Sequence, residues 1–366
     1  MNRMERKSWE DRNCTDEKSG ARRYLLPKNG NVYKANLHCH TNLSDGQLSP
    51  EAVKELYRSH GYSVVAYTDH SLFIPHHELT DENFLALAGF EAEFNEKELF
   101  PGKRELKSCH LCLIAGSPHI RVQPCWNERY AYIGNAGKHW DKIRFDESEE
   151  PFERIYSPEG INELIRKGRE AGFFVTYNHP AWSLETYEQY TAYEGMHAME
   201  ILNYGAEVMG YPSYAPNVYD DMLRKGERIF AVAADDNHNR FPEEDPRCDS
   251  FGGFVMIKAE ELKYESIMNA LFKGDFYASS GPEIYELYVE GNEIHVSCSD
   301  CVSIALNTGQ RSARAVRPEK GTVINEATFT FLDSDRYLRI TVKDAQGRFA
   351  DTNACFLDTA HFPKKA

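Results

Sequence analysis

Short apolar runs alternate with helical patterns along most of the chain, from about residue 33 to residue 278. Several of these runs are apolar almost throughout, as expected for strands that are buried on both faces of a sheet. The pattern predicts eight strands before residue 260, and these are 33–39, 63–68, 85–91, 110–115, 173–178, 198–203, 229–234 and 253–257.

Helix signals fill the gaps between these runs. Apolar residues recur at i, i+3, i+4 and i+7, which predicts amphipathic helices. Ser49-Pro50 and Ser157-Pro158 each offer a serine N-cap followed by a proline in the first turn, and Gly172 marks one helix end. A repeated order of strand, helix and glycine is typical of a βα barrel or a doubly wound sheet.

Two stretches depart from this rhythm. Residues 117–157 contain tryptophans, tyrosines and many charges without a clear period, which indicates a long insertion. After residue 281, short alternating runs separated by turns predict a small all-β region. We therefore expect a polar arm at 1–30, one large domain at 31–280 that carries the insertion, and a β-rich domain at 281–366.

Charge and composition narrow the possible partners. The net charge is −15, with 57 acidic and 42 basic residues, which argues against a long nucleic-acid track. A small anionic substrate is still compatible, because bound metal ions can invert the local field. The chain has no apolar run long enough for a membrane span and no signal-like start. The nine scattered cysteines are interpreted as reduced thiols, which favours a cytoplasmic protein.

The candidate chemistry begins at His38-Cys39-His40. Alternate residues of a strand point to the same side, so His38 and His40 should converge on one point. Two neutral imidazoles at this spacing form a natural metal chelate. Asp45 follows in a Ser-Asp-Gly turn, from which it can fold back over the same point.

Further polar groups stand where other apolar strands end. His70, Glu91 and His179 each close such a run, and Asp236 and His238 follow another with the same alternate spacing. His110 instead begins its run. In βα barrels the carboxyl ends of the strands form the rim where active sites assemble.

Each of these residues has an ordinary structural explanation when it is taken alone, such as a hydrogen-bonded rim histidine or a turn-capping aspartate. The accumulation is harder to explain in this way. Buried unpaired charges cost several kcal/mol. A cluster of three carboxylates and six imidazoles therefore predicts a bound cation.

These motifs resemble those of the PHP (polymerase and histidinol phosphatase) family of metallohydrolases. His38-Cys39-His40 with Ser44-Asp45-Gly46 is similar to the first motif of the family, and Thr68-Asp69-His70 to the second. The remaining matches are His110, Asp236-Asn237-His238, Glu91 and His179. The order of the motifs and the trailing β region also resemble the CehA/McbA-type subgroup.

The resemblance implies a fold and an activity. The fold would be α/β, a distorted (β/α)7 barrel of the PHP type followed by the small C-terminal all-β domain. The enzyme would be a metal-dependent phosphoesterase that acts on a small phosphorylated metabolite or nucleotide. One alternative is a hydrolase of non-phosphate esters, carbamates or amides with the same metals, and another is a non-catalytic binding module. The many ionisable groups argue against a purely structural module.

The resemblance also implies a set of ligands for two or three divalent ions. His38, His40, Glu91 and Asp236 would hold one ion, and Glu91 would bridge to a second ion held by His110 and His179. Asp45, His70 and His238 would hold a third. Nitrogen and oxygen ligands without thiolate suit Mn, Fe or Zn.

The expected chemistry follows from such ions. A water that bridges two cations would lose a proton and attack the substrate as hydroxide. Asp236 or His179 would transfer protons to the leaving group. Arg240 and Tyr204, which lie just past strand ends, are the candidate contacts to the substrate.

Overall fold

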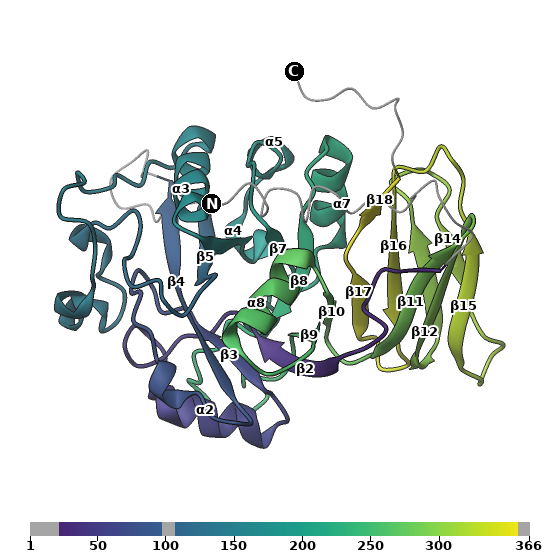
Figure 1. The fold of residues 1–366 in the computed structure, drawn as a ribbon, viewed down its shortest axis with the longest axis horizontal. Helices are drawn as coiled ribbons and strands as arrows, with labels where there is room; N and C mark the ends of the chain where they lie inside the picture. Colours follow the sequence, from purple (N-terminus) through teal and green to yellow (C-terminus); the bar gives the residue numbers. More distant parts are fainter. Residues whose placement is uncertain (1–21, 97–106, 358–366) are drawn as a thin grey trace.

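The computed structural model describes residues 22–96 and 107–357, which form a mixed α/β protein with two sheets (Figure 1). The part of the large sheet that carries the predicted site contains β2 (Asn31–Asn36), β3 (Val64–Tyr67), β4 (Leu85–Asn95), β5 (Ser108–Ala115), β6 (Phe173–Tyr177), β7 (Ala198–Asn203) and β8 (Phe230–Ala234). Most of their residues are buried, as the near-continuous apolar runs predicted.

The helices begin where the sequence signals placed them. Ser49 accepts a hydrogen bond from the backbone N–H of Ala52, and Ser157 accepts one from Gly160, so both serines are N-caps. The α-helices are α2 (Pro50–Ser59), α3 (Pro158–Glu170), α4 (Pro180–Ser183), α5 (Tyr187–Tyr190), α6 (Tyr204–Val208), α7 (Pro216–Lys225) and α8 (Tyr264–Lys273). The chain also forms a short 3-10 helix, η1 (His77–Leu79).

The predicted (β/α)7 barrel is not shown by the structure. The strands β2 to β8 are neighbours in chain order, but the hydrogen-bonded path ends at β8, so the sheet is not closed. The reason lies at β2, whose second edge pairs antiparallel with β9 (Phe254–Ala259). Beyond the ends of β2 and β8, the two sides are linked by an isolated parallel bridge between Cys39 and Asn237 and by the backbone hydrogen bonds around it.

Strand β5 runs against its neighbours. It pairs antiparallel with both β4 and β6, whereas β2, β3 and β4 are parallel to one another. Because of this reversal, the start of β5 lies at the edge of the sheet where the neighbouring strands end. His110 therefore reaches the site although it begins its strand, which periodicity alone did not explain.

The C-terminal strands gather at one end of the molecule (Figure 1). The small antiparallel sheet contains β1 (Arg23–Tyr24), β11 (Ile284–Glu290), β12 (Glu293–Cys301) and β15 (Ile324–Thr330). The other strands extend the large sheet, and they are β10 (Phe276–Ser279), β13 (Ser303–Asn307), β14 (Arg314–Val316), β16 (Tyr337–Lys343), β17 (Phe349–Thr352) and β18 (Cys355–Phe356). β17 pairs with β10, so strands from before and after residue 281 belong to the same large sheet. The domain boundary predicted there stays a prediction.

Buried polar contacts join the C-terminal strands to the preceding part. Arg339, on β16, is almost fully buried and contacts Asp220 of α7 at 2.6 Å and Asp351 of β17 at 2.9 Å. The side chain of Asn353 donates to the backbone oxygens of Gly274 and Phe276. Because these charged groups are buried, each of them needs a partner, since an unpaired buried charge would be strongly destabilising.

The insertion at 117–157 has little regular structure. It contains the 3-10 helices η2 (Glu128–Tyr130), η3 (Ala136–Lys138) and η4 (Trp140–Lys142). Its own apolar residues Trp126, Ala131, Ala136 and Ile143 form a small buried cluster with Leu72.

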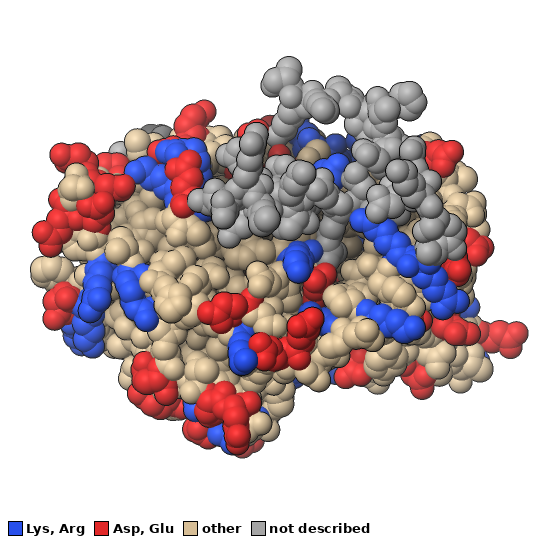
Figure 2. Space-filling view, viewed as in Figure 1, with Lys and Arg blue, Asp and Glu red and all other residues tan. Residues whose placement is uncertain are grey.

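The structure bears on the expected absence of a membrane span and on the expected reduced state of the cysteines. No helix among residues 22–96 and 107–357 is long and apolar enough to cross a membrane. Seven cysteines of the described chain are free thiols, but Cys355 is disulfide-bonded, so the expectation of reduced thiols is wrong at that position. The cytoplasmic location stays a prediction. Figure 2 shows acidic and basic side chains interspersed over one face of the described residues.

Candidate metal centre

The nine predicted ligands converge at the edge of the large sheet where β2, β3, β6 and β8 end. A cavity of about 460 Å³ opens over them, and seven of the nine line it: Asp45, His70, Glu91, His110, His179, Asp236 and His238. His38 and His40 are almost completely buried beside these residues. A larger hollow of about 780 Å³, between the insertion and α3, contains none of the nine.

The first group comprises His38, His40, Asp236 and Glu91. The Nε2 atoms of His38 and His40 lie 3.0 Å apart, and Asp236 Oδ1 is 3.2 Å from the first and 3.1 Å from the second. The two oxygens of Glu91 each lie 3.3 Å from one of the imidazoles. Ligands about 2.1 Å from one ion, at tetrahedral or octahedral angles, would be separated by about 3.0–3.4 Å. These spacings are those of one coordination sphere.

A second group adjoins the first through Glu91. Its Oε1 lies 3.0 Å from His110 Nδ1 and 3.3 Å from His179 Nε2. Glu91 Oε2 faces the other way, 3.1 Å from His70 Nδ1. Glu91 is therefore placed between neighbouring groups, as a bridging carboxylate would be.

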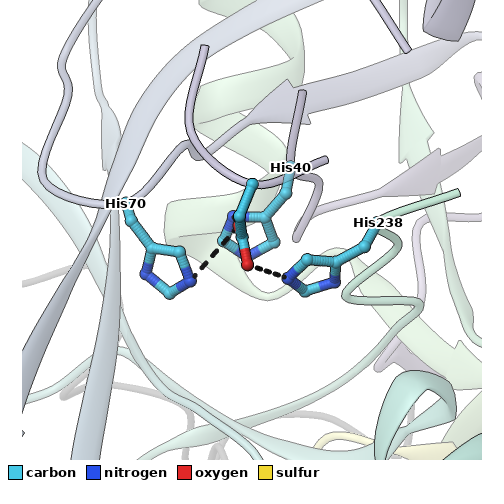
Figure 3. A group of neighbouring side chains, drawn as sticks. His40, His70 and His238 are labelled. Carbon is cyan, nitrogen blue, oxygen red and sulfur yellow. Dashed lines mark ion pairs between the residues drawn. The ribbon is translucent and has the colours of Figure 1, made fainter. Parts of the chain in front are cut away.

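The third group surrounds Asp45. Its Oδ2 is 3.2 Å from His238 Nε2, and its Oδ1 is 3.8 Å from His70 Nε2. Figure 3 shows the rings of His40, His70 and His238 gathered around this carboxylate. The ring of His40 stacks with both other rings, at 4.4 Å between centroids in each case. This group is wider than the first.

Two buried nitrogen atoms of the site lack a hydrogen-bond partner, which bears on whether cations fit these groups. His40 Nδ1 and His70 Nδ1 are buried and have no hydrogen-bond partner. His70 Nδ1 lies close to Glu91 Oε2, but the pair is not aligned as a hydrogen bond. An unsatisfied buried polar atom costs about 1–3 kcal/mol. A neutral imidazole offers a lone pair on one nitrogen only, and a cation bound through Nδ1 would satisfy either of these atoms; the mixture of imidazoles and carboxylates fits divalent metal ions.

Electrostatics in the site favour positive charge. Burial would raise the pKa of Glu91, but the imidazoles of His38 and His110 hold it well below its usual value. Burial would likewise lower the pKa of His38, yet Asp236 and the other acidic groups around it raise it well above the usual value. Burial, together with His40, lowers the pKa of His70 to about 3. The carboxylates are thus ionised and His70 is neutral, which are the forms that bind metal, whereas His38 would release a proton when an ion binds.

Backbone strain is concentrated at the same place. His179 and Asp236 have φ values of 24° and 54°, and Ser71, next to His70, has a φ of 57°. Left-handed conformations of residues other than glycine cost of order 1–3 kcal/mol and cluster at functional sites. The surrounding structure therefore holds these ligands in positions that the backbone alone would not adopt.

Glu200 is a functional candidate that sequence reasoning missed. It is buried in β7 and lies 2.7 Å from His38 Nδ1, while its other oxygen accepts hydrogen bonds from His179 N and Asn203 Nδ2 at 2.8 Å. A carboxylate on Nδ1 fixes the tautomer, so that Nε2 of His38 is free for a metal. The available signal was a single glutamate inside an otherwise apolar strand.

Asp69 supports the site without being a predicted ligand. Its carboxylate accepts hydrogen bonds from the backbone and side chains of Thr41 and Ser44, at 2.6–3.1 Å. These bonds hold the turn that carries Asp45. The Thr68-Asp69-His70 motif thus supplies one candidate ligand and one supporting residue.

The predicted catalytic and substrate residues have different surroundings. Asp236 and His179 both line the cavity, with His179 Nε2 3.9 Å from Asp236 Oδ2. Arg240 also lines it, is exposed, and lies 3.1 Å from Asp45 Oδ2. Tyr204 is not among the lining residues, and its ring covers Gly252, where an added Cβ would be 2.1 Å away. Of the two predicted substrate contacts, only Arg240 faces the cavity.

No protein-family model and no curated protein sequence match the chain. Comparison of structures finds a two-domain protein from Bacteroides vulgatus described as containing a PHP-like metal-dependent phosphoesterase. It shares 13% identity over 90% of this chain and 95% of that one, with a TM-score of 0.40. The PHP resemblance named from the motifs thus recurs in the description of this structure.

Two further structures are similar to a smaller part of the chain. A protein from Bifidobacterium adolescentis described as a metal-dependent phosphoesterase shares 16% identity over 59% of this chain and 92% of that one, with a TM-score of 0.39. An amidohydrolase from Chromobacterium violaceum with bound sulfate shares 14% identity over 58% of this chain and 93% of that one, with a TM-score of 0.33. None of these descriptions names the CehA/McbA-type subgroup.

Proposed function

We propose that the chain is a PHP-type metal-dependent hydrolase that cleaves phosphoesters of small anionic molecules. The observation that carries this proposal is the first group, in which donor atoms of His38, His40 and Asp236 lie 3.0–3.2 Å apart and each oxygen of Glu91 lies 3.3 Å from one of the two imidazoles. Such spacing between carboxylates and imidazoles is costly without a cation. The two adjoining groups extend the centre to three ions, of Mn, Fe or Zn type.

The charge of the loaded centre favours a phosphate group over a neutral ester or amide. Three divalent cations would face only three carboxylate ligands, because the other ligands are neutral imidazoles. The centre would therefore keep a net positive charge, and Arg240 adds another at its rim. A doubly charged phosphate balances this excess, whereas a carbamate or an amide does not.

Divalent ions at this site would supply Lewis acidity and a hydroxide nucleophile at neutral pH. The protein supplies orientation and proton transfer. Asp236 points Oδ1 at the two imidazoles of the first group, and its Oδ2 would accept the proton of the attacking water and pass it to the leaving-group oxygen. Arg240, at the mouth, would orient the charged end of the substrate.

Trp182 limits the cavity on the side of the second group. Its ring packs edge-on against His110 and His179, with centroids 5.0 Å and 4.9 Å away, and it lines the cavity. An indole beside two ligands reduces the access of bulk water. Electrostatic interactions with the substrate are stronger in such a place.

The test is a substrate screen with defined metal content. Protein freed of metal by chelation and then reloaded with Mn, Fe or Zn is given phosphomonoesters, phosphodiesters, carboxylic esters, carbamates and amides. We expect metal-dependent release of phosphate, its loss in Asp236→Asn, and its retention in Asp146→Asn, which changes an exposed aspartate of the insertion. Hydrolysis of the carbonyl substrates alone would overturn the phosphoesterase proposal, and no hydrolysis by any loaded form would overturn the enzyme.

A further inference from the structure

Two of the three ligands of the third group lie on turns that touch the insertion. Asp45 is in the turn after His40, and His70 follows the end of β3. His238, the third ligand, is held elsewhere, because its backbone N–H donates to Asp249 and its Nδ1 lies 2.9 Å from the backbone oxygen of Asp236. The support of the group is therefore divided between the insertion and the end of β8.

The insertion lies directly against the Asp45 turn. The backbone N–H of Asn135 donates to Ser44 O at 2.7 Å, and its side chain donates to Asn42 O at 3.0 Å. Gly134, with a φ of 57°, approaches so closely that an added Cβ would be 2.2 Å from Ser44 O and 2.7 Å from Asp45 Cβ. Only glycine allows this approach.

Residues near both ends of the insertion hold the turn after His70. The side chain of Gln123 donates to Ser71 O at 3.0 Å and accepts from Phe73 N at 2.8 Å. Arg154 donates to Ser71 Oγ at 2.9 Å and pairs with buried Glu93, also at 2.9 Å. Gln123 and Arg154 are themselves buried, so these bonds are protected from water.

An apolar cluster joins the two turns through the insertion. Leu72, two residues after His70, packs with Trp126 and Ile143 of the insertion, and Leu43 of the Asp45 turn packs against the same cluster. Hydrogen bonds and apolar packing thus fix both turns to one element. His38 is held differently, by Glu200, whereas Glu91 is held by Asn178 at its side chain and by Ser71 N at its backbone oxygen.

We infer that the insertion at 117–157 is a positioning element for the third ion, because it adds a second connection, besides the bonds of Asp69, between the turns that carry Asp45 and His70. This inference rests on the proposed metal centre and assigns to the insertion a role in that centre. Displacement of the insertion should weaken the third ion while the first two remain bound. Gln123, Gly134, Asn135 and Arg154 would act through the two turns, and none of them is a proposed ligand.

The test is metal stoichiometry in Gly134→Ala, measured by elemental analysis after equilibration with Mn or Zn and by titration against a chelator. We expect three ions in the wild type, two in the variant, and at least 10-fold weaker binding of the third. Gly137→Ala is the matched control, because it lies in the same insertion and its added Cβ would meet only Ala131 O at 3.2 Å. That variant should keep three ions.

A second variant keeps the test informative if Gly134→Ala does not fold. Asn135→Ala removes the side-chain bond to Asn42 O and the exposed bond from Lys138 Nζ, and it introduces no clash, so the variant should fold and still bind the third ion more weakly. If both variants keep three ions at wild-type affinity, or if a folded variant loses all of its ions together, the inference is wrong. A wild type with only two ions would overturn the third site alone, and a wild type without metal would overturn the proposed centre itself.

Discussion

Replacement of Glu200 by glutamine should weaken the first ion although Glu200 is not a ligand. The side chain keeps its shape, but one oxygen becomes an amide that donates hydrogen bonds. If the amide faces His38, the imidazole must accept at Nδ1, and its proton moves to Nε2, where the metal should bind. If it faces the other way, it meets the donors His179 N and Asn203 Nδ2.

The expected magnitude follows from these contacts. Loss of the partner that orients a metal-binding histidine typically lowers metal affinity about 10–100-fold, which corresponds to about 1.4–2.7 kcal/mol. Only the second rotamer leaves buried donors facing a donor, at a cost of about 1–3 kcal/mol. With either rotamer Glu200→Gln should bind the first ion more weakly, because binding requires the unfavourable tautomer or the unfavourable rotamer.

The assay is a competition titration of the metal-free protein with a chelator of known affinity, together with urea unfolding. Glu207→Gln is the matched control, because Glu207 is exposed and contacts only Ser213 in the described chain. The control should bind metal like the wild type. If Glu200→Gln is folded and binds its metals within threefold of the wild type, the assignment of Glu200 as a positioning residue is wrong.

Three further predictions concern other parts of the molecule. Glu91→Ala should lower kcat and metal content more than Asp45→Ala, because Glu91 joins two groups and Asp45 serves one; equal losses would contradict the bridging role. His197 is buried, which lowers its pKa well below the usual value, so the unfolded chain binds a proton that the folded chain does not. As the pH falls below about 6.5, the wild type should lose up to about 1.4 kcal/mol of stability per pH unit relative to His197→Gln, and parallel urea-unfolding profiles would refute this. Arg339→Leu should destabilise the protein by about 3 kcal/mol or more, because it leaves buried Asp351 without its cation, while the metal content of the folded fraction stays unchanged; loss of metal would implicate the C-terminal strands in the centre.

Much of the site could be predicted because its signals are local. The spacing of His38 and His40 depends only on strand geometry, and Glu91 and His179 stand where apolar runs end. The structure places Glu91 and His179 at one cavity, with His38 and His40 buried beside it. Their role as ligands stays a prediction that the metal analysis tests.

Features that depend on distant pairing could not be predicted in this way. Hydrophobic periodicity does not indicate which strands pair or in which direction. It therefore could not predict that β5 is antiparallel to its neighbours, that β9 pairs with the second edge of β2, or that β17 extends the large sheet. For this reason the sequence could not predict that the sheet is open instead of a closed barrel. Glu200 was missed because an apolar run around a single acid reads as an ordinary buried strand.

The most direct test of the account is the metal content of the wild-type protein, purified without chelator, replenished with divalent ions and freed of excess metal. The three groups predict at least two tightly bound ions per chain, and three when the insertion holds the Asp45 and His70 turns in place. Less than one ion per chain after replenishment would contradict the central claim, because the buried carboxylates and imidazoles would then be balanced by protons alone.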